Sequence, residues 1–66
     1  MKVFVSYKGK KEIVQLKEKS SVRQLLEKME INPETVLVGR KGEIIPETEQ
    51  IRDKDRIELI RTVSGG

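Results

Sequence analysis

The stretch Ser20-Ser21-Val22-Arg23-Gln24-Leu25-Leu26-Glu27-Lys28-Met29-Glu30 decides how this chain can fold. Its apolar residues recur at i, i+3, i+4 and i+7, which is the spacing of one face of an α-helix; they are Val22, Leu25, Leu26 and Met29. Ser21 precedes this stripe, and Gln24 stands three residues later, which is the spacing of a capping box. The pattern predicts a helix that begins after Ser21, ends near Glu30 and has a single apolar side to bury.

The segments on either side of this helix alternate between apolar and polar residues, as β-strands do. Glycine-containing turns at 8–10 and 39–42 and an acidic turn at 52–55 separate them, and Asn32-Pro33 predicts an extended turn after the helix. The order of elements is then strand, strand, helix, strand, short strand, strand. The predicted strands are residues 2–7, 12–16, 36–38, 43–45 and 56–61.

Alternation assigns the strand residues to two faces of one sheet, because successive side chains point to opposite sides. The helix must cover one face, since neither element can bury its apolar side alone. The side chains predicted to face the helix are Val3, Val5, Tyr7, Val14, Leu16, Val36, Val38, Ile57 and Leu59, with Ile51 filling the core from a loop.

Four large apolar residues are predicted to lie on the other, uncovered face, namely Phe4, Ile13, Leu37 and Ile60. Contiguous exposed apolar side chains on a small domain indicate a surface where a partner docks. The alternative is that they are scattered singly, which is normal for exposed apolar residues. The docking interpretation is favoured because the last strand of this face runs directly into the C-terminal residues.

Composition excludes several classes of function. The chain has 66 residues, enough for one domain with a small core, and it contains neither cysteine nor histidine. Thiol nucleophiles, disulfides and the common zinc sites are therefore excluded. Its N-terminus is too polar for a signal peptide, and no apolar run approaches membrane-spanning length, so we expect a cytoplasmic domain without membrane contact.

The charged residues are interpreted as surface and turn residues. The net charge of +3 comes from 14 basic and 11 acidic residues that are mixed along the chain, and few aromatic residues accompany the lysines, so no direct nucleic-acid binding is predicted. The alternative is that the lysines at 8, 10, 11, 17 and 19 contact a transfer RNA or an acidic groove of a partner. Acidic residues at 47, 49, 53 and 55 are typical of turns, and we prefer that interpretation to a metal or acid–base site.

The chain stops on Val63-Ser64-Gly65-Gly66. Two residues without side chains form the slimmest possible arm, which can enter a narrow channel in a partner and carries the Gly66 carboxylate at its end. We predict a single domain over residues 1–66 with a flexible tail at 62–66. The alternative for the tail is an ordinary frayed terminus.

Taken together, these segments resemble the small sulfur-carrier and ubiquitin-like modifier proteins of the β-grasp fold. The resemblance covers the whole chain and is closest to the short carriers of thiamin biosynthesis and the archaeal small modifiers, with the small subunit of molybdopterin synthase more distant. Those subunits often carry proline just before the final Val-x-Gly-Gly, where this chain has Thr62. The resemblance implies an α+β fold, the ubiquitin-like β-grasp, with a mixed four- to five-stranded sheet and one helix on one face. The segments that carry it are the hairpin, the capped helix, 32–38, 42–46, the turn ending at Asp55 and Val63-Ser64-Gly65-Gly66.

The resemblance also implies a mechanism centred on Gly66. In these relatives a separate ATP-dependent activating enzyme, which uses ATP and magnesium, adenylates the terminal glycine. A sulfur donor protein then brings a persulfide, and the resulting thiocarboxylate delivers sulfur to thiamin or molybdopterin precursors or to transfer RNA. The chain would be the substrate of its partner, not an enzyme, and would bind no cofactor itself.

Two alternatives to the sulfur carrier are open. In modifiers of this fold a lysine amine of a target protein attacks the activated Gly66, and an isopeptide bond forms. The lesser alternative is a noncovalent β-grasp adaptor whose tail has no chemistry.

Overall fold

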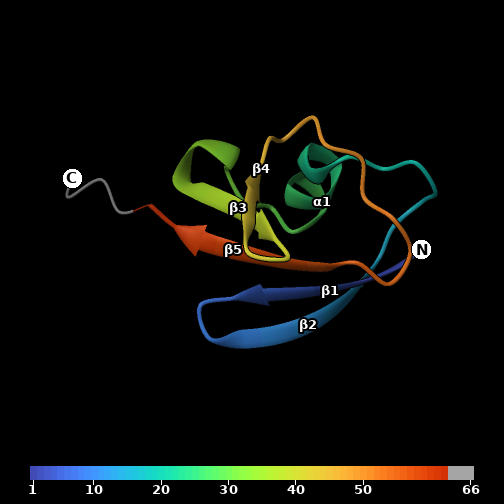
Figure 1. The fold of residues 1–66 in the computed structure, drawn as a ribbon, viewed down its shortest axis with the longest axis horizontal. Coiled ribbons are helices and arrows are strands. Elements are labelled where there is room, and N and C mark those ends of the chain that lie inside the picture. Colours follow the sequence, from blue (N-terminus) through green and yellow to red (C-terminus); the bar gives the residue numbers. More distant parts are fainter. Residues whose placement is uncertain (63–66) are drawn as a thin grey trace.

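The computed structural model describes residues 1–62. These residues form one helix, one short 3-10 helix and five strands, which confirms the predicted α+β class and the order of its elements (Figure 1). The elements are β1 (Lys2–Tyr7), β2 (Lys10–Gln15), α1 (Val22–Lys28), η1 (Pro33–Thr35), β3 (Val36–Arg40), β4 (Glu43–Ile45) and β5 (Arg56–Arg61).

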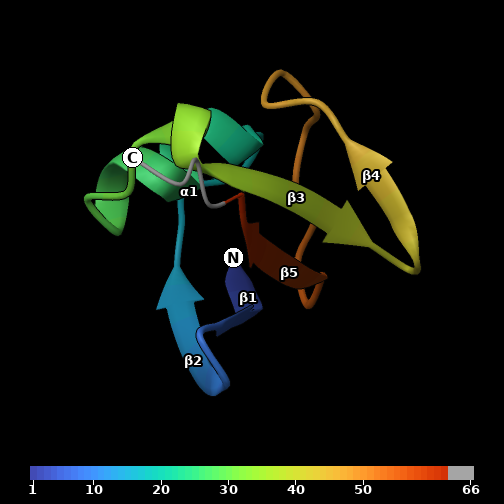
Figure 2. The ribbon, with the colours of Figure 1, turned by 90° about the vertical axis from the view of Figure 1, so that its left-hand side faces the viewer.

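The five strands form one mixed sheet in the order β2-β1-β5-β3-β4. The central strand β5 is the last in the chain and pairs in parallel with β1, the first, whereas every other pair is antiparallel. Figure 2 shows the sheet curving past α1, with β2 and β4 at its two edges. Because α1 lies over one face, the part of the chain that the structure describes leaves the other face of the sheet uncovered.

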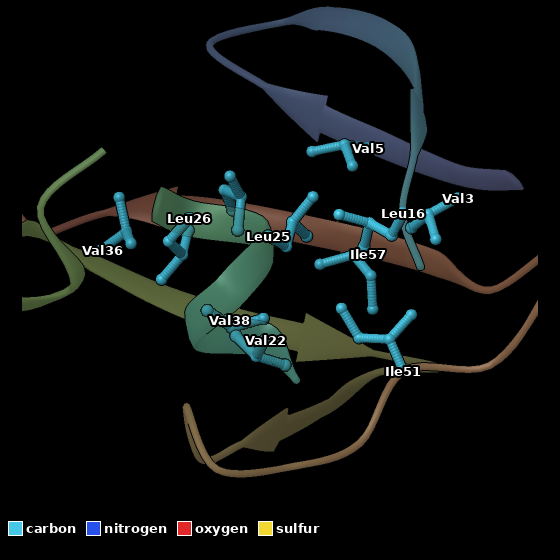
Figure 3. Packing of buried hydrophobic residues seen from close by; sticks show 11 residues of the cluster. Val3, Val5, Leu16, Val22, Leu25, Leu26, Val36, Val38, Ile51 and Ile57 are labelled. Carbon is cyan, nitrogen blue, oxygen red and sulfur yellow. The ribbon is translucent and has the colours of Figure 1, made fainter. Parts of the chain in front are cut away.

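The core lies between α1 and the covered face of the sheet (Figure 3). The residues predicted to face inward are buried or half-buried, and Ile51 reaches the core from the loop before β5, as predicted. The fully buried core residues come from α1, β1, β5 and this loop, so the helix stripe and the central strands form one continuous cluster. The buried hydrophobic residues are Val3, Val5, Leu16, Val22, Leu25, Leu26, Val36, Val38, Ile51, Ile57 and Leu59.

The start of α1 confirms the predicted capping box. The Ser21 hydroxyl accepts the backbone N–H of Gln24 at 3.3 Å, and the Gln24 side chain accepts the backbone N–H of Ser21 at 2.8 Å. The helix ends at Lys28 with Met29 as its C-cap, and Glu30 then adopts a left-handed backbone with φ 59°. Within residues 1–62, no helix is long and apolar enough to cross a membrane.

Both hairpins are tighter than predicted. Gly39 and Arg40 belong to β3, where they pair with Ile44 and Glu43, so placing them in a turn was wrong. The turn consists of Lys41 and Gly42 alone, with φ 54° and 79°, and the first hairpin likewise turns on residues 8 and 9, with φ 51° and 75°. Two-residue turns with positive φ at both positions match the right-handed twist of paired strands, which is why the strands extend so far.

Two further boundaries differ from the prediction. β2 covers residues 10–15, so Leu16 is buried just after the strand and not within it. After α1, Asn32 is extended, as its position before proline predicts, but residues 33–35 form the turn η1. The Asn32 side chain caps η1 by accepting the backbone N–H of Glu34 at 2.9 Å.

Arg40, at the end of β3, holds the long loop that precedes β5. Its Nη2 donates to Glu49 Oε2 at 2.6 Å, and its Nη1 donates to Asp55 Oδ2 and to the backbone carbonyl of Gln50, each at 3.2 Å. The hydrogen bond to Glu49, helped by the charges of both carboxylates, raises the pKa of Arg40 although burial opposes the rise. Asp53 Oδ1 also accepts the backbone N–H of Lys2 at 2.8 Å. Three of the four acidic residues assigned to turn surface therefore have a structural role that the sequence did not reveal.

Candidate functional site

The register of the strands places the predicted docking residues on the uncovered face, which we call the open face. Phe4 on β1 lies directly opposite Ile13 on β2, and Leu37 on β3 lies directly opposite Ile60 on β5. Their neighbours along each strand are the inward residues of the core, so all four side chains point away from α1. The predicted orientation of these residues is confirmed; their role in docking is still a prediction.

A fifth apolar residue, Ile44 on β4, joins this face. It pairs with Gly39, the residue that follows the inward Val38, and it therefore projects on the same side as Leu37. From the sequence, Ile44 falls in a predicted strand but is assigned to no face, because two consecutive isoleucines give no alternation to follow. The exposed fractions are 37% for Phe4, 59% for Ile13, 45% for Leu37, 58% for Ile44 and 41% for Ile60.

The exposed apolar residues form two groups, not one continuous patch. Phe4 is level with Arg56, whereas Leu37 is level with Ile60, four residues further along β5. At about 3.3 Å per strand residue this step is about 13 Å. We call Leu37, Ile44 and Ile60 the tail-side cluster and Phe4 with Ile13 the far pair, since β5 runs from the second group toward the first.

A groove lies on the open face beside the far pair. It is floored by Ser6, Gly39 and Glu58, which lie level with one another on β1, β3 and β5. The far pair and Arg56 border one end, while Lys11 and the Lys41-Gly42 turn border its sides. The open face can therefore offer a partner both apolar contacts and charged groups.

The end of β5 fixes where the chain leaves the sheet. β5 ends at Arg61, and the backbone N–H of Thr62 then donates to the carbonyl of Thr35 in η1 at 2.9 Å. Thr62, the first residue of the predicted tail, is thus held against the domain. A proline there could not make this bond, because it has no N–H. The predicted reactive residue Gly66 and its neighbours Gly65, Ser64 and Val63 lie outside the described residues.

The β1–β2 turn lies at the same end of the sheet as this exit (Figure 1). Tyr7 is level with Leu59 in the parallel pair, and the ammonium of Lys8 in the turn lies 5.3 Å from the centre of the Tyr7 ring. Within residues 1–62, no three acidic, histidine or cysteine side chains gather as a metal ion would require. What the described residues provide is an exposed, largely apolar face beside the start of the tail.

Comparison with known proteins identifies relatives along the whole chain. The family model described as the ThiS family matches residues 1–66. The sulfur carrier protein TtuB of Thermus thermophilus is 33% identical over 66 residues, and the match covers 100% of both chains.

Solved structures share the fold. The thiamine biosynthesis protein ThiS from Geobacter metallireducens superposes with a TM-score of 0.71 at 27% identity, covering 100% of both chains. A Caldiarchaeum subterraneum ubiquitin superposes with a TM-score of 0.72 at 20% identity, covering 100% of this chain and 98% of that one. These neighbours confirm the predicted ubiquitin-like β-grasp, and the second of them, at its low identity, informs the fold alone.

Proposed function

Because this chain belongs to the ThiS family of sulfur carriers, we propose that the Gly66 carboxylate is the group on which it carries sulfur. The observation that carries the proposal is the extent of the family match, which runs through residue 66 and so includes the tail. The similarity to a sulfur carrier over the full length of both chains supports it. We take the cytoplasm, expected from the sequence, as the compartment.

The proposed activation begins at the Gly66 carboxylate. A carboxylate is a poor electrophile, so one of its oxygens first attacks the α-phosphorus of ATP, and pyrophosphate leaves. The product is an acyl-adenylate, whose carbonyl carbon is open to nucleophiles. The chain supplies only the carboxylate and a surface for docking; the activating enzyme supplies ATP, magnesium and the catalytic groups.

Sulfur then replaces AMP. The terminal sulfur of a persulfide on a sulfur donor protein attacks the acyl carbon, AMP leaves, and an acyl disulfide forms. A thiol reductant cleaves the S–S bond, which releases the donor and leaves a thiocarboxylate on Gly66. The thiocarboxylate sulfur is nucleophilic and can pass to a small-molecule or transfer-RNA acceptor that has itself been activated.

We further propose that the open face docks the activating enzyme. Phe4, Ile13, Leu37 and Ile60 expose apolar area that a partner could cover, and β5 connects this face directly to Thr62. A partner bound there would hold the start of the tail in a fixed position relative to its active site. Such positioning is a large part of catalysis when a reacting group must be placed within bonding distance.

The first experiment is an intact-mass measurement on the protein recovered from its own cells under non-reducing conditions. We expect a species heavier by the replacement of one oxygen with sulfur, and we expect that species to disappear when Gly66 is deleted. A gel for larger products is run beside it. A ladder of Gly66-dependent conjugates without the sulfur-bearing species would favour the modifier, and neither signal would favour the adaptor.

A further inference from the structure

The groove on the open face carries more positive than negative side chains. Lys11, Lys41 and Arg56 border it, and Glu58 lies in its floor. Glu12 also borders it but pairs with the buried Val5, so its side chain projects to the helix side of the sheet. An acidic ligand segment would therefore meet three cations along the borders of the groove.

Gly39 is the residue that keeps this groove open. A Cβ built on it would lie 3.6 Å from the Glu43 carbonyl oxygen and 3.9 Å from that of Glu58, which are ordinary contact distances. Its φ is outside the left-handed region, unlike that of Gly42. Neither the backbone nor local crowding requires glycine here, although glycine weakens a strand. A glycine in a strand interior often marks a place where another molecule approaches closely, which fits the groove above it.

The chemistry of the groove favours a protein segment over RNA. Glu58 lies in the floor, where it can accept a hydrogen bond from the backbone N–H of a peptide, a donor that a phosphate backbone lacks. Phe4 and Ile13 form an apolar wall at one end, and an aliphatic side chain of a partner would fit against it. Mixed apolar, basic and acceptor groups in one groove are the features of a protein interface.

We infer that this groove receives an acidic segment of the activating enzyme, whose carboxylates face Lys11, Lys41 and Arg56 and whose apolar side chain packs on the far pair. This inference rests on the proposed function. The groove and the tail-side cluster lie in line along β5, so one partner surface that reaches the tail can cover both. Charge complementarity of this kind steers association and sets its salt dependence.

The test uses the full-length chain and the activating enzyme encoded in the same genome, with carrier-dependent ATP–pyrophosphate exchange as the readout. In the groove variant Lys11→Glu with Arg56→Glu, we expect KM for the carrier to rise about tenfold or more while kcat stays within about twofold. KM for the wild type should rise with ionic strength, and this dependence should be weaker in the variant. The matched control is Lys10→Glu with Lys17→Glu, which makes the same change in net charge at exposed sites outside the groove and should change KM less than about twofold.

A second variant tests the shape of the groove without changing charge. Gly39→Leu places a side chain over the floor, and we expect it to raise KM while leaving the salt dependence in place. Gly39→Ala should have a smaller effect in the same direction. Urea unfolding of each variant confirms that the fold is intact before KM is compared.

The outcomes separate this inference from the function on which it rests. If the wild type supports no exchange, or exchange persists without Gly65 and Gly66, the proposed function fails. If the wild type is activated but the groove variants keep its KM, the groove has no role in this docking. Binding of bulk transfer RNA to the wild type and to the groove variant is measured separately by fluorescence anisotropy. If the groove variant loses RNA binding but keeps the KM of the wild type, the groove belongs to RNA and the inference is overturned.

Discussion

Leu26 illustrates how much one side chain contributes in a core of this size. It is fully buried in the stripe of α1, and we expect Leu26→Ala to lower the free energy of unfolding by about 2 to 5 kcal/mol. The loss combines the missing apolar burial with the cavity that remains. Urea denaturation followed by circular dichroism measures it.

The control for this prediction is Ile44→Ala, which removes a comparable side chain from the open face. Ile44 is 58% exposed, so this substitution should change the free energy of unfolding by no more than about 0.5 kcal/mol. Equal losses at the two positions would mean that α1 does not form the core as described.

At the residue scale, alternation was a reliable guide wherever the sequence alternates. Phe4 between Val3 and Val5, and Leu37 between Val36 and Val38, were assigned to the correct faces from their neighbours alone. Ile44 could not be assigned, because Ile45 follows it and both are apolar. Only its pairing with Gly39, a contact made in the folded sheet, fixes its direction.

At the scale of elements, Arg40 connects β3 to the loop before β5. We expect Arg40→Met to lower the free energy of unfolding by about 1 to 3 kcal/mol, because Asp55 and the Gln50 carbonyl both lose a charged donor. The control is Arg52→Met in the same loop, an exposed side chain whose replacement should change stability by less than about 0.5 kcal/mol. Urea unfolding of both variants at neutral pH measures the two free energies of unfolding. Equal values would mean that the Arg40 contacts do not stabilise the fold.

The sign of any pH dependence from Arg40 follows from its raised pKa. A group whose pKa is higher in the folded state contributes stability below its unfolded value and loses that contribution as pH rises through the folded value. For an arginine this window lies in strong alkali, so Arg40 itself should give no pH dependence near neutrality.

Local signals predicted the elements, and long-range contacts set their ends. Ser21 and Gln24 are three residues apart, so the start of α1 could be read from the sequence. Arg40, by contrast, binds partners nine and fifteen residues away along the chain, and no local sequence pattern predicts such contacts. The same limit explains why β3 was ended too early, since Gly39 extends the strand by pairing with residues on two other strands.

One face of the sheet packs on α1 and forms the core, and we propose that the other face receives the activating enzyme. We expect Ile60→Asp to lower the free energy of unfolding by no more than about 1 kcal/mol, because the side chain is half-exposed in a strand. The same variant should raise KM for the carrier in the exchange assay, since a charge would be buried at the tail-side cluster. Its control is Arg61→Asp, a larger charge change on the next residue of β5, which points to the other face. Loss of folding in Ile60→Asp, or the same KM in both variants, would contradict the assignment of the open face.

The order of the strands in the sheet could not be predicted from sequence patterns. Alternation predicts which residues face outward but not which strands are neighbours. The order β2-β1-β5-β3-β4 brings Phe4 beside Ile13 and Leu37 beside Ile60, and it separates the two pairs along β5. The division of the open face, and the groove that lies within it, follow from this order.

The hydrogen bond from Thr62 to Thr35 also fixes the point from which the length of the tail is counted. Four residues follow Thr62, and fully extended they span at most about 14 Å. If Gly66 is activated as proposed, the α-phosphate of ATP must lie within bonding reach of the end of that span. The bond thereby sets how deep the catalytic pocket of an activating enzyme can be, and an enzyme whose pocket is deeper would be unable to use this carrier without first breaking it.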